Sequence, residues 1–272
     1  MSFDIPLLIA AGFFVGIIAG FIGIGGNVVL IPITLELFRA WKIPEEVRTH
    51  LTYGTMLLVT VVTAVSATVR QHFQQLILWK LVPYFVLGSI AATQLFGSIL
   101  KHVHGNTLQL FFAVMIFALG VRWFFTRNHP DAPQTRLLNP WLMFLCGMLV
   151  GVISLFTGLG GGVIMIPLLS SLFHVPTKNL AGTSSAVLIF TAASATASYL
   201  WGGVGVEGLP PDAIGYVWPK VALLVAIGTV PGSQIGAVLN KKYAKQWFRV
   251  TFAAIQILMA LWIFSRIWKE WQ

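Results

Sequence analysis

Two stretches of the sequence decide the fold. Residues 20–32 read GFIGIGGNVVLIP, and residues 155–167 read LFTGLGGGVIMIP, 135 positions further along the chain. Both place a cluster of glycines inside a long apolar segment, although a glycine costs about 1 kcal/mol relative to alanine within a helix. Because the sequence accepts this cost several times in two matching places, we expect a purposeful break in a helix at each of them.

The similarity between the two halves extends beyond these stretches. At the offset of 135, identical residues are Gly12, Gly16, Gly23, Gly25, Gly26 and Pro32, which match Gly147, Gly151, Gly158, Gly160, Gly161 and Pro167. Further along, Gly54-Thr55 matches Gly182-Thr183, residues 63–68 closely match 191–196, and Lys80, Gly88, Gln94 and Lys101 match Lys220, Gly228, Gln234 and Lys241. This order predicts two homologous repeats, residues 1–127 and 140–272, joined by a polar, proline-containing linker at 128–139.

The composition is that of a membrane protein. The 272 residues are 57% hydrophobic and 9% charged, whereas soluble domains carry about 25% charged residues. Apolar segments long enough to span a bilayer, at about 20 residues each, are 51–69, 76–100, 108–125, 181–201, 217–239 and 248–268. The predicted fold is therefore an all-α polytopic membrane protein with one glycine-broken helix and three spanning helices in each repeat.

The two broken segments, 5–37 and 141–173, are too long for one straight span. If each broken helix crosses the bilayer fully, the chain has eight spans and parallel repeats. If each folds back as a re-entrant hairpin, the repeats are inverted. Half-helices of about 15 residues are short for a full crossing, which favours the inverted arrangement, while the distribution of Lys and Arg between the two sides barely helps.

Charge and reactive side chains exclude several classes of function. The net charge of +9 comes from short basic clusters between apolar runs, which suit loops facing lipid headgroups and not a nucleic-acid groove. The single cysteine, Cys146, excludes an internal disulfide. The six histidines do not cluster at ligand spacing, and no nucleophile–base or paired-carboxylate motif occurs. We therefore expect no metal site, no cofactor and no catalytic residue.

The acidic residues indicate the charge of the cargo. All eight lie near the ends of apolar runs or in loops, at Asp4, Glu36, Glu45, Glu46, Asp131, Glu207, Asp212 and Glu270. Cation pumps and most proton-coupled carriers place Asp or Glu within the membrane. Their absence from the middle of the runs favours an anion site built from neutral donors.

The glycine breaks supply such donors. A helix that begins inside the membrane presents unpaired N–H groups and the positive end of its dipole, which suit an anion without any charged side chain. Two such breaks in two repeats are typical of a transporter site near the bilayer midplane. The predicted substrate-binding residues of the breaks are Gly23, Gly25, Gly26, Asn27, Thr157, Gly160, Gly161 and Gly162. Asn27 is further expected to cap the half-helix that follows and to offer its amide to the ligand.

Close helix packing is the alternative explanation for the glycines, because small residues spaced by four positions let helices touch. We assign Gly12, Gly16, Gly147 and Gly151 to such packing. For the clusters themselves the substrate site is favoured, and packing stays open as the alternative.

Other polar side chains in the spans are candidate substrate ligands. Those predicted to contact the substrate are Tyr53, Thr55, Gln94, Thr183, Ser184, Ser185 and Gln234. The Ser and Thr hydroxyls could instead bond to their own helices, and the matched glutamines could join helices beside the site. Lys80 and Lys220 lie near the ends of long runs, where their side chains can snorkel to the membrane surface. The alternative is that they attract anions at the mouth of the transport path, a role that Arg48 and His50 could also have.

The duplicated glycine boxes resemble a known family. The pattern GxGG(G/N)xxxxP occurs at 23–32 and 158–167, GTSS follows at 182–185, and Gly88 and Gly228 lie within later spans. With these features the chain resembles the TauE/SafE sulfite exporter family, also called the toluene sulfonate uptake permease family, over almost its whole length. The resemblance implies export or uptake of sulfite, thiosulfate, sulfonates or small organic carboxylates. The chain departs from the pattern at Asn27, and at 53–56, which read YGTM where the second repeat has AGTS.

The sequence thus predicts a membrane transporter, with export favoured, that moves small anions by alternating access. An anion channel is the first alternative, and a membrane enzyme or sensor subunit is a less favoured one. The predicted partners are the small anion and the lipid bilayer, with no nucleic acid. Coupling to protons or another ion, and assembly as a homodimer, stay open. We expect a multi-pass protein of a bacterial inner (plasma) membrane.

Overall fold

The chain is built from helices. A computed structural model describes residues 5–22, 26–125, 139–243 and 246–270, so Gly23 and Gly25 lie outside the described residues. In this part of the chain the only β-pairing is one isolated bridge between Ile214 and Val217. The elements are α1 (Ile5–Ile22), α2 (Asn27–Ala40), α3 (Glu45–Phe73), α4 (Val82–Gly97), η1 (Leu100–His102), α5 (Gly105–Phe125), α6 (Pro140–Thr157), α7 (Gly162–Ser171), α8 (Thr177–Gly202), α9 (Pro219–Tyr243) and α10 (Gln246–Glu270). The predicted all-α class is confirmed.

Four of the described helices, α3, α5, α6 and α8, are long and apolar enough to cross a membrane. The fourth helix of the chain, α4, is shorter than the predicted span at 76–100. It has 16 residues, or about 24 Å at 1.5 Å per residue. The helix starts late because Gln75 has a left-handed φ of 55° and the following residues up to 81 form turns and extended backbone.

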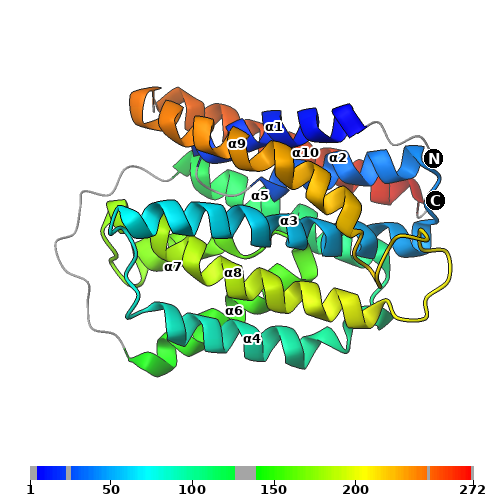
Figure 1. Ribbon diagram of the computed structural model, residues 1–272, viewed down its shortest axis with the longest axis horizontal. Helices are drawn as coiled ribbons and strands as arrows, with labels where there is room; N and C mark the ends of the chain where they lie inside the picture. The colour runs from blue at the N-terminus through cyan, green and yellow to red at the C-terminus, as the bar shows by residue number, and fades with distance from the viewer. Residues whose placement is uncertain (1–4, 23–25, 126–138, 244–245, 271–272) are drawn as a thin grey trace.

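The first broken helix folds back on itself. Along α1, Gly12 and Gly16 lie against the carbonyls of Val225 and Thr229, so α1 runs parallel to α9. α2 returns in the opposite direction, since Phe38 near its end packs on the residue that precedes α9. The start of α1 and the end of α2 therefore lie at the same end of the molecule, where Figure 1 also shows both chain termini.

The second broken helix forms the same hairpin from the opposite end. Gly147 and Gly151 on α6 lie against the carbonyls of Phe85 and Ser89, so α6 runs parallel to α4. α7 then returns, because Phe173 just beyond it packs on Phe85 with ring centroids 5.1 Å apart. α2 ends just before the start of α3, whereas α4 begins just after the end of α3, so the two hairpins enter from opposite ends of that long helix. Figure 1 accordingly shows α2 and α7 towards opposite ends.

Positions that match in sequence make matching contacts in the structure. A Cβ added to Gly88 would lie 2.0 Å from the carbonyl oxygen of Phe144, and one added to Gly228 would lie 2.0 Å from that of Ile9. At such separations only glycine allows the two backbones to touch. Since α1 packs on α9 and α6 packs on α4, each half of the chain holds the hairpin of the other half.

Large apolar side chains cover the outer faces of the helices. Phe14, Leu87, Leu95, Leu223 and Leu258 are each at least 60% exposed. A soluble protein rarely exposes so much apolar surface, whereas lipid solvates it. The outer surface therefore suits a bilayer, and the buried core lies between the two hairpins and the long helices α3 and α8.

Candidate functional site

The tip of the second hairpin is a turn made of glycines in the left-handed region. α6 ends at Thr157, and φ is +68° at Gly158, +75° at Gly160 and +84° at Gly161. A residue with a side chain would pay about 1–2 kcal/mol at each of these positions. The expected break is therefore present, and its geometry accounts for the glycines better than helix packing does.

The turn leaves main-chain donors at the start of α7. The amides of Ile164 and Met165 donate to the carbonyl of Gly161, at 3.2 and 3.0 Å. The amides of Gly162 and Val163 precede these bonds and have no acceptor within their own helix. Together with the helix dipole they form a positive end inside the protein, because Gly162 and Val163 are both buried.

The tip of the first hairpin corrects the predicted role of Asn27 as a helix cap. Gly26 occupies the N-cap position of α2, with no side-chain cap, and its carbonyl accepts from the amides of Val29 and Leu30 at 3.0 Å each. Asn27 is instead the first residue of α2. It does not cap the helix because its side-chain amide has partners on other elements.

Asn27 joins the two hairpin tips. Its Nδ2 donates to the carbonyl of Gly158 at 2.7 Å, to the hydroxyl of Thr60 at 2.8 Å and to the carbonyl of Met56 at 3.0 Å. Thr60 donates its own hydrogen to Met56 at 3.0 Å, so it accepts from Asn27. The two hydrogens of this nitrogen are shared among the three acceptors, which fixes the orientation of the amide. The amide donors thus bind protein, and the tips of both hairpins meet beside α3.

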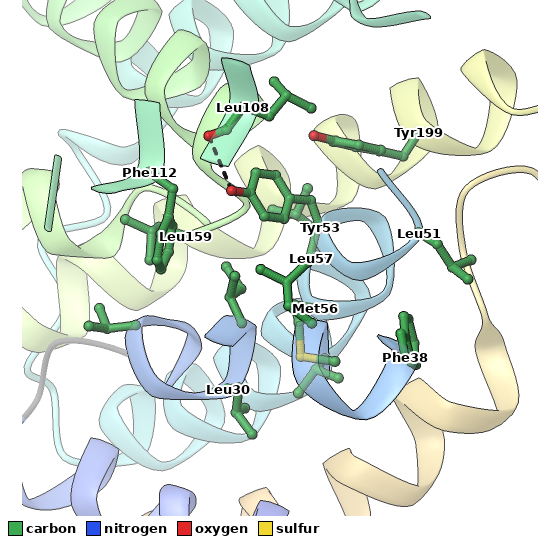
Figure 2. Close-up of a cluster of buried hydrophobic side chains, with 14 of the residues drawn as sticks. Leu30, Phe38, Leu51, Tyr53, Met56, Leu57, Leu108, Phe112, Leu159 and Tyr199 are labelled. Carbon is green, nitrogen blue, oxygen red and sulfur yellow. Dashed lines mark hydrogen bonds between the residues drawn. The ribbon is translucent and has the colours of Figure 1, made fainter. Parts of the chain in front are cut away.

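The walls around the meeting point are apolar and tightly packed. A Cβ added to Gly158 would lie 2.9 Å from the ring of Tyr53, and one added to Gly160 would lie 2.6 Å from the methyl of Thr60. Figure 2 shows the Tyr53 hydroxyl donating to the carbonyl of Leu108, at 3.1 Å, within a cluster of buried apolar side chains. Tyr53 therefore lies next to the tip and contributes a ring, while its hydroxyl bonds to α5.

Sequence reasoning missed one residue of this region, Ser154. Its hydroxyl is fully buried and has no hydrogen-bond partner among the described residues, and its Cβ lies 3.7 Å from the Cβ position of Gly161. An unpartnered buried hydroxyl costs about 1–3 kcal/mol, so its place beside a glycine turn suggests a ligand contact. A single serine in an apolar helix gives no signal by which the sequence could have marked it.

The sequence matches a known family over nearly its whole length. The model of the family described as Sulfite exporter TauE/SafE matches residues 8–263. The chain belongs to this family.

Relatives of this TauE/SafE protein cover nearly all of its length. A protein of Methanocaldococcus jannaschii is 29% identical over 95% of this chain and 95% of its own. A protein of Haemophilus influenzae is 24% identical over 96% and 98%, and one of Bacillus subtilis is 22% identical over 95% and 96%. Each is named "Probable membrane transporter protein". No solved structure matches the chain significantly. The family and the apolar helices make this TauE/SafE protein a membrane transporter.

Three predicted ligands of the TauE/SafE protein, Thr55, Thr183 and Ser185, have hydroxyls that bond to the protein itself. Thr55 accepts from the amide of Trp218 at 3.0 Å, and Thr183 accepts from the amide of Leu78 at 3.1 Å. Ser185 donates to the carbonyl of the residue one turn earlier, and Ser184 is buried in the same turn of α8. The hydroxyls of Thr55 and Thr183 thus hold the loops before α9 and α4 in place.

Thr157 closes the glycine turn. Its hydroxyl donates to the carbonyl of Ile153 at 2.6 Å and accepts from the amide of Leu159 at 3.3 Å. The side chain is buried. Thr157 therefore shapes the tip from within α6.

The matched glutamines make matched contacts between the halves. Gln94 donates to the hydroxyl of Ser194 at 2.9 Å, and Gln234 donates to that of Ser66 at 3.1 Å. Gln234 also accepts from Arg70. The structure thus shows them as contacts between helices, which is the alternative that the sequence left open.

Charged groups of the TauE/SafE protein stay away from the tips. The carboxylates whose side chains the structure describes lie in loops or towards helix ends, at Glu36, Glu45, Glu46, Glu207 and Asp212. Lys220 lies 3.8 Å from Asp212, with both side chains about half exposed. In the described residues, no group of three or more His, Cys, Asp or Glu side chains could hold a metal ion. The electrostatics of the tips therefore come from main-chain dipoles and neutral side chains.

Proposed function

We propose that this TauE/SafE protein moves a small oxyanion or carboxylate, such as sulfite, thiosulfate or a sulfonate, across a bacterial inner membrane. The observation that carries this proposal is the meeting of the two hairpin tips, where Asn27 of the first donates to Gly158 of the second at 2.7 Å. Broken helices that meet inside a membrane protein are typical of transporter substrate sites. The substrate-binding residues we propose are Gly26, Gly160, Gly161 and Gly162 of the tips and Ser154, together with Gly23 and Gly25, which lie outside the described residues.

The chemistry of the tips supports an anion. The start of α7 directs the free amides of Gly162 and Val163 towards the tip, and helix starts attract negative charge. The hydroxyl of Ser154 adds a further donor, which has no partner in the described part of the chain. A neutral site also spares the anion from a permanent ion pair, which would bind it too tightly to be released.

The arrangement of the hairpins supports alternating access. The hairpins enter from opposite ends, and each packs on a helix of the other half. A rocking of the group formed by α1, α2 and α9 against the group formed by α4, α6 and α7 therefore carries the tips relative to each other while both helix–helix contacts stay intact. Such a motion exposes the meeting point to one side of the membrane at a time.

The test is a panel of radiolabelled anions with the purified protein in liposomes. We expect saturable flux of at least one of sulfite, thiosulfate, a sulfonate or a small carboxylate, with and without a pH gradient to detect proton coupling. Flux that rises in proportion to concentration without saturating would favour an anion channel. Liposomes that move none of these anions would refute the proposal.

A further inference from the structure

A small pocket lies at the end of the molecule where the first hairpin enters. It lies between α2, α3, α5 and α10, and three arginines and two glutamates line it together with a glutamine: Arg39, Arg48, Arg266, Glu36, Glu45 and Gln109. Guanidinium groups present planar sets of N–H donors that match the oxygens of oxyanions. The pocket is also partly open, because the side chain of Glu45 is 53% exposed.

One arginine of this pocket is poorly satisfied. Arg266 makes two close contacts with Glu36, at 2.7 and 2.9 Å, and is therefore engaged by that carboxylate. Arg48 approaches Glu45 only to 3.9 Å. Its Nε is buried and has no hydrogen-bond partner among the described residues. A buried N–H of a charged group without an acceptor is costly. The guanidinium of Arg48 is therefore suited to donate hydrogen bonds to an oxygen of a ligand.

The pocket and the hairpin tips lie at the two ends of the same helix, α2. Arg39 and Asn27 are both on α2, twelve residues apart, which corresponds to about 18 Å along the helix. The hairpin thus connects the pocket at the end of the molecule with the meeting point of the tips. Attraction by a cationic mouth raises the local concentration of an anion and speeds its arrival.

We propose that this pocket is an entry site where the transported oxyanion binds Arg48 in competition with Glu45, before it reaches the hairpin tips. The inference rests on the proposed transport of a small oxyanion. Arg39 supplies a second positive charge at the pocket, and the Arg266–Glu36 pair forms its fixed wall. Because Glu45 is exposed and only loosely paired with Arg48, the anion displaces it at little cost.

The competition gives two substitutions opposite effects. In liposomes, Arg48→Gln is expected to raise the KM for thiosulfate about tenfold, the factor for one lost charge-assisted contact, with the maximal rate little changed. Glu45→Gln is expected to lower the KM by about threefold, because it removes the competitor. The matched control is Glu46→Gln, since Glu46 occupies the same first turn of α3 but does not line the pocket. It is expected to leave the KM unchanged.

Equilibrium binding of radiolabelled thiosulfate to the purified protein separates this inference from the transport proposal. Weaker binding by Arg48→Gln and tighter binding by Glu45→Gln would support the entry site even if no flux were seen. If Glu45→Gln behaves like Glu46→Gln in binding and in KM, the entry site is refuted while transport stands. Absence of saturable thiosulfate binding to the unmodified protein would also refute it.

Discussion

The two hairpins share one design, two helices around a break, but differ in their chemistry. At matched positions the first tip has Asn27 bonded to Thr60. The second has Gly162, whose Cβ position lies 2.8 Å from a methyl of Leu188. A polar pair in the first half thus corresponds to an apolar contact in the second. The shared feature is thus the pair of helices on either side of the break, whereas the backbone at the matched glycines differs, since φ is −74° at Gly26 and +84° at Gly161. In the first half a polar side chain connects the two tips.

The hairpins also differ in how they are held at their outer ends. Glu36 on α2 accepts two bonds from Arg266 on α10, whereas Ser171 on α7 accepts one bond from Arg122 on α5 at 3.0 Å. A paired carboxylate holds a helix more firmly than a single hydroxyl. We therefore expect the second hairpin to be the more mobile of the two during transport.

The largest effect on transport is expected at the left-handed glycines of the second tip. Gly160→Leu should abolish flux while the protein still inserts, because φ is +75° and a Cβ would lie 2.6 Å from the methyl of Thr60. The control is Gly205→Leu, since Gly205 has φ of +77° but no atom within 4 Å of its Cβ position. That variant should transport normally. Equal flux from both variants would remove the second tip from the transport path.

The next effect concerns the connection between the tips. Asn27→Leu keeps the size of the side chain but removes its donors, and it leaves the buried carbonyl of Gly158 without this partner. The loss of about 1–3 kcal/mol should lower the rate of flux by about fivefold or more. Flux is measured at equal amounts of inserted protein. An unaltered rate would show that the tips need no polar connection.

Transplanting the polar pair into the second tip tests whether the two tips are interchangeable. Gly162→Asn alone should lower flux, because its side chain meets Leu188. Adding Leu188→Thr recreates the pair of the first half and should recover part of the lost rate, by about threefold or more, since a buried amide then regains an acceptor. If the loss of flux in the double variant equals the combined losses of Gly162→Asn and Leu188→Thr alone, the polar pair cannot be moved from one tip to the other.

The smallest effect is expected at the outer ends. Arg266→Gln should destabilise the protein by about 0.5–1 kcal/mol, because the ion pair is partly exposed and screened. Arg122→Gln should cost less. Thermal unfolding in detergent at low and high salt measures the difference, and the Arg266 effect should shrink with salt. A larger loss for Arg122→Gln would reverse the expected order of mobility.

The sequence predicted the helix breaks because their cause is local. Three glycines that require positive φ, at 158, 160 and 161, are costly anywhere else, so their positions could be read directly. The directions of the hairpins could not be read in the same way. They depend on which helices the small residues touch, and the pairing of α1 with α9 joins positions more than 200 residues apart.

The side chains of the site were harder to predict than its backbone. Asparagine is a residue type that often caps helices, but the side-chain amide of Asn27 is held by three acceptors on other elements. The matched glutamines were identified as a pair, whereas their serine partners lie in the opposite halves. Ser154 gave no signal, because its significance lies in the contacts that it lacks. Tertiary placement therefore decided the role of each polar residue.

The most direct measurement uses Ser154, beside the meeting point of the tips. In a Cys146→Ser background, Ser154→Cys changes one atom and leaves a single thiol to react with a membrane-impermeant reagent. We predict that this thiol reacts in flux-competent liposomes and that a transported carboxylate protects it, with half-protection at the concentration that half-saturates flux. A thiol that stays inert from both sides during transport, or that no transported anion protects, would contradict an anion path between the two tips.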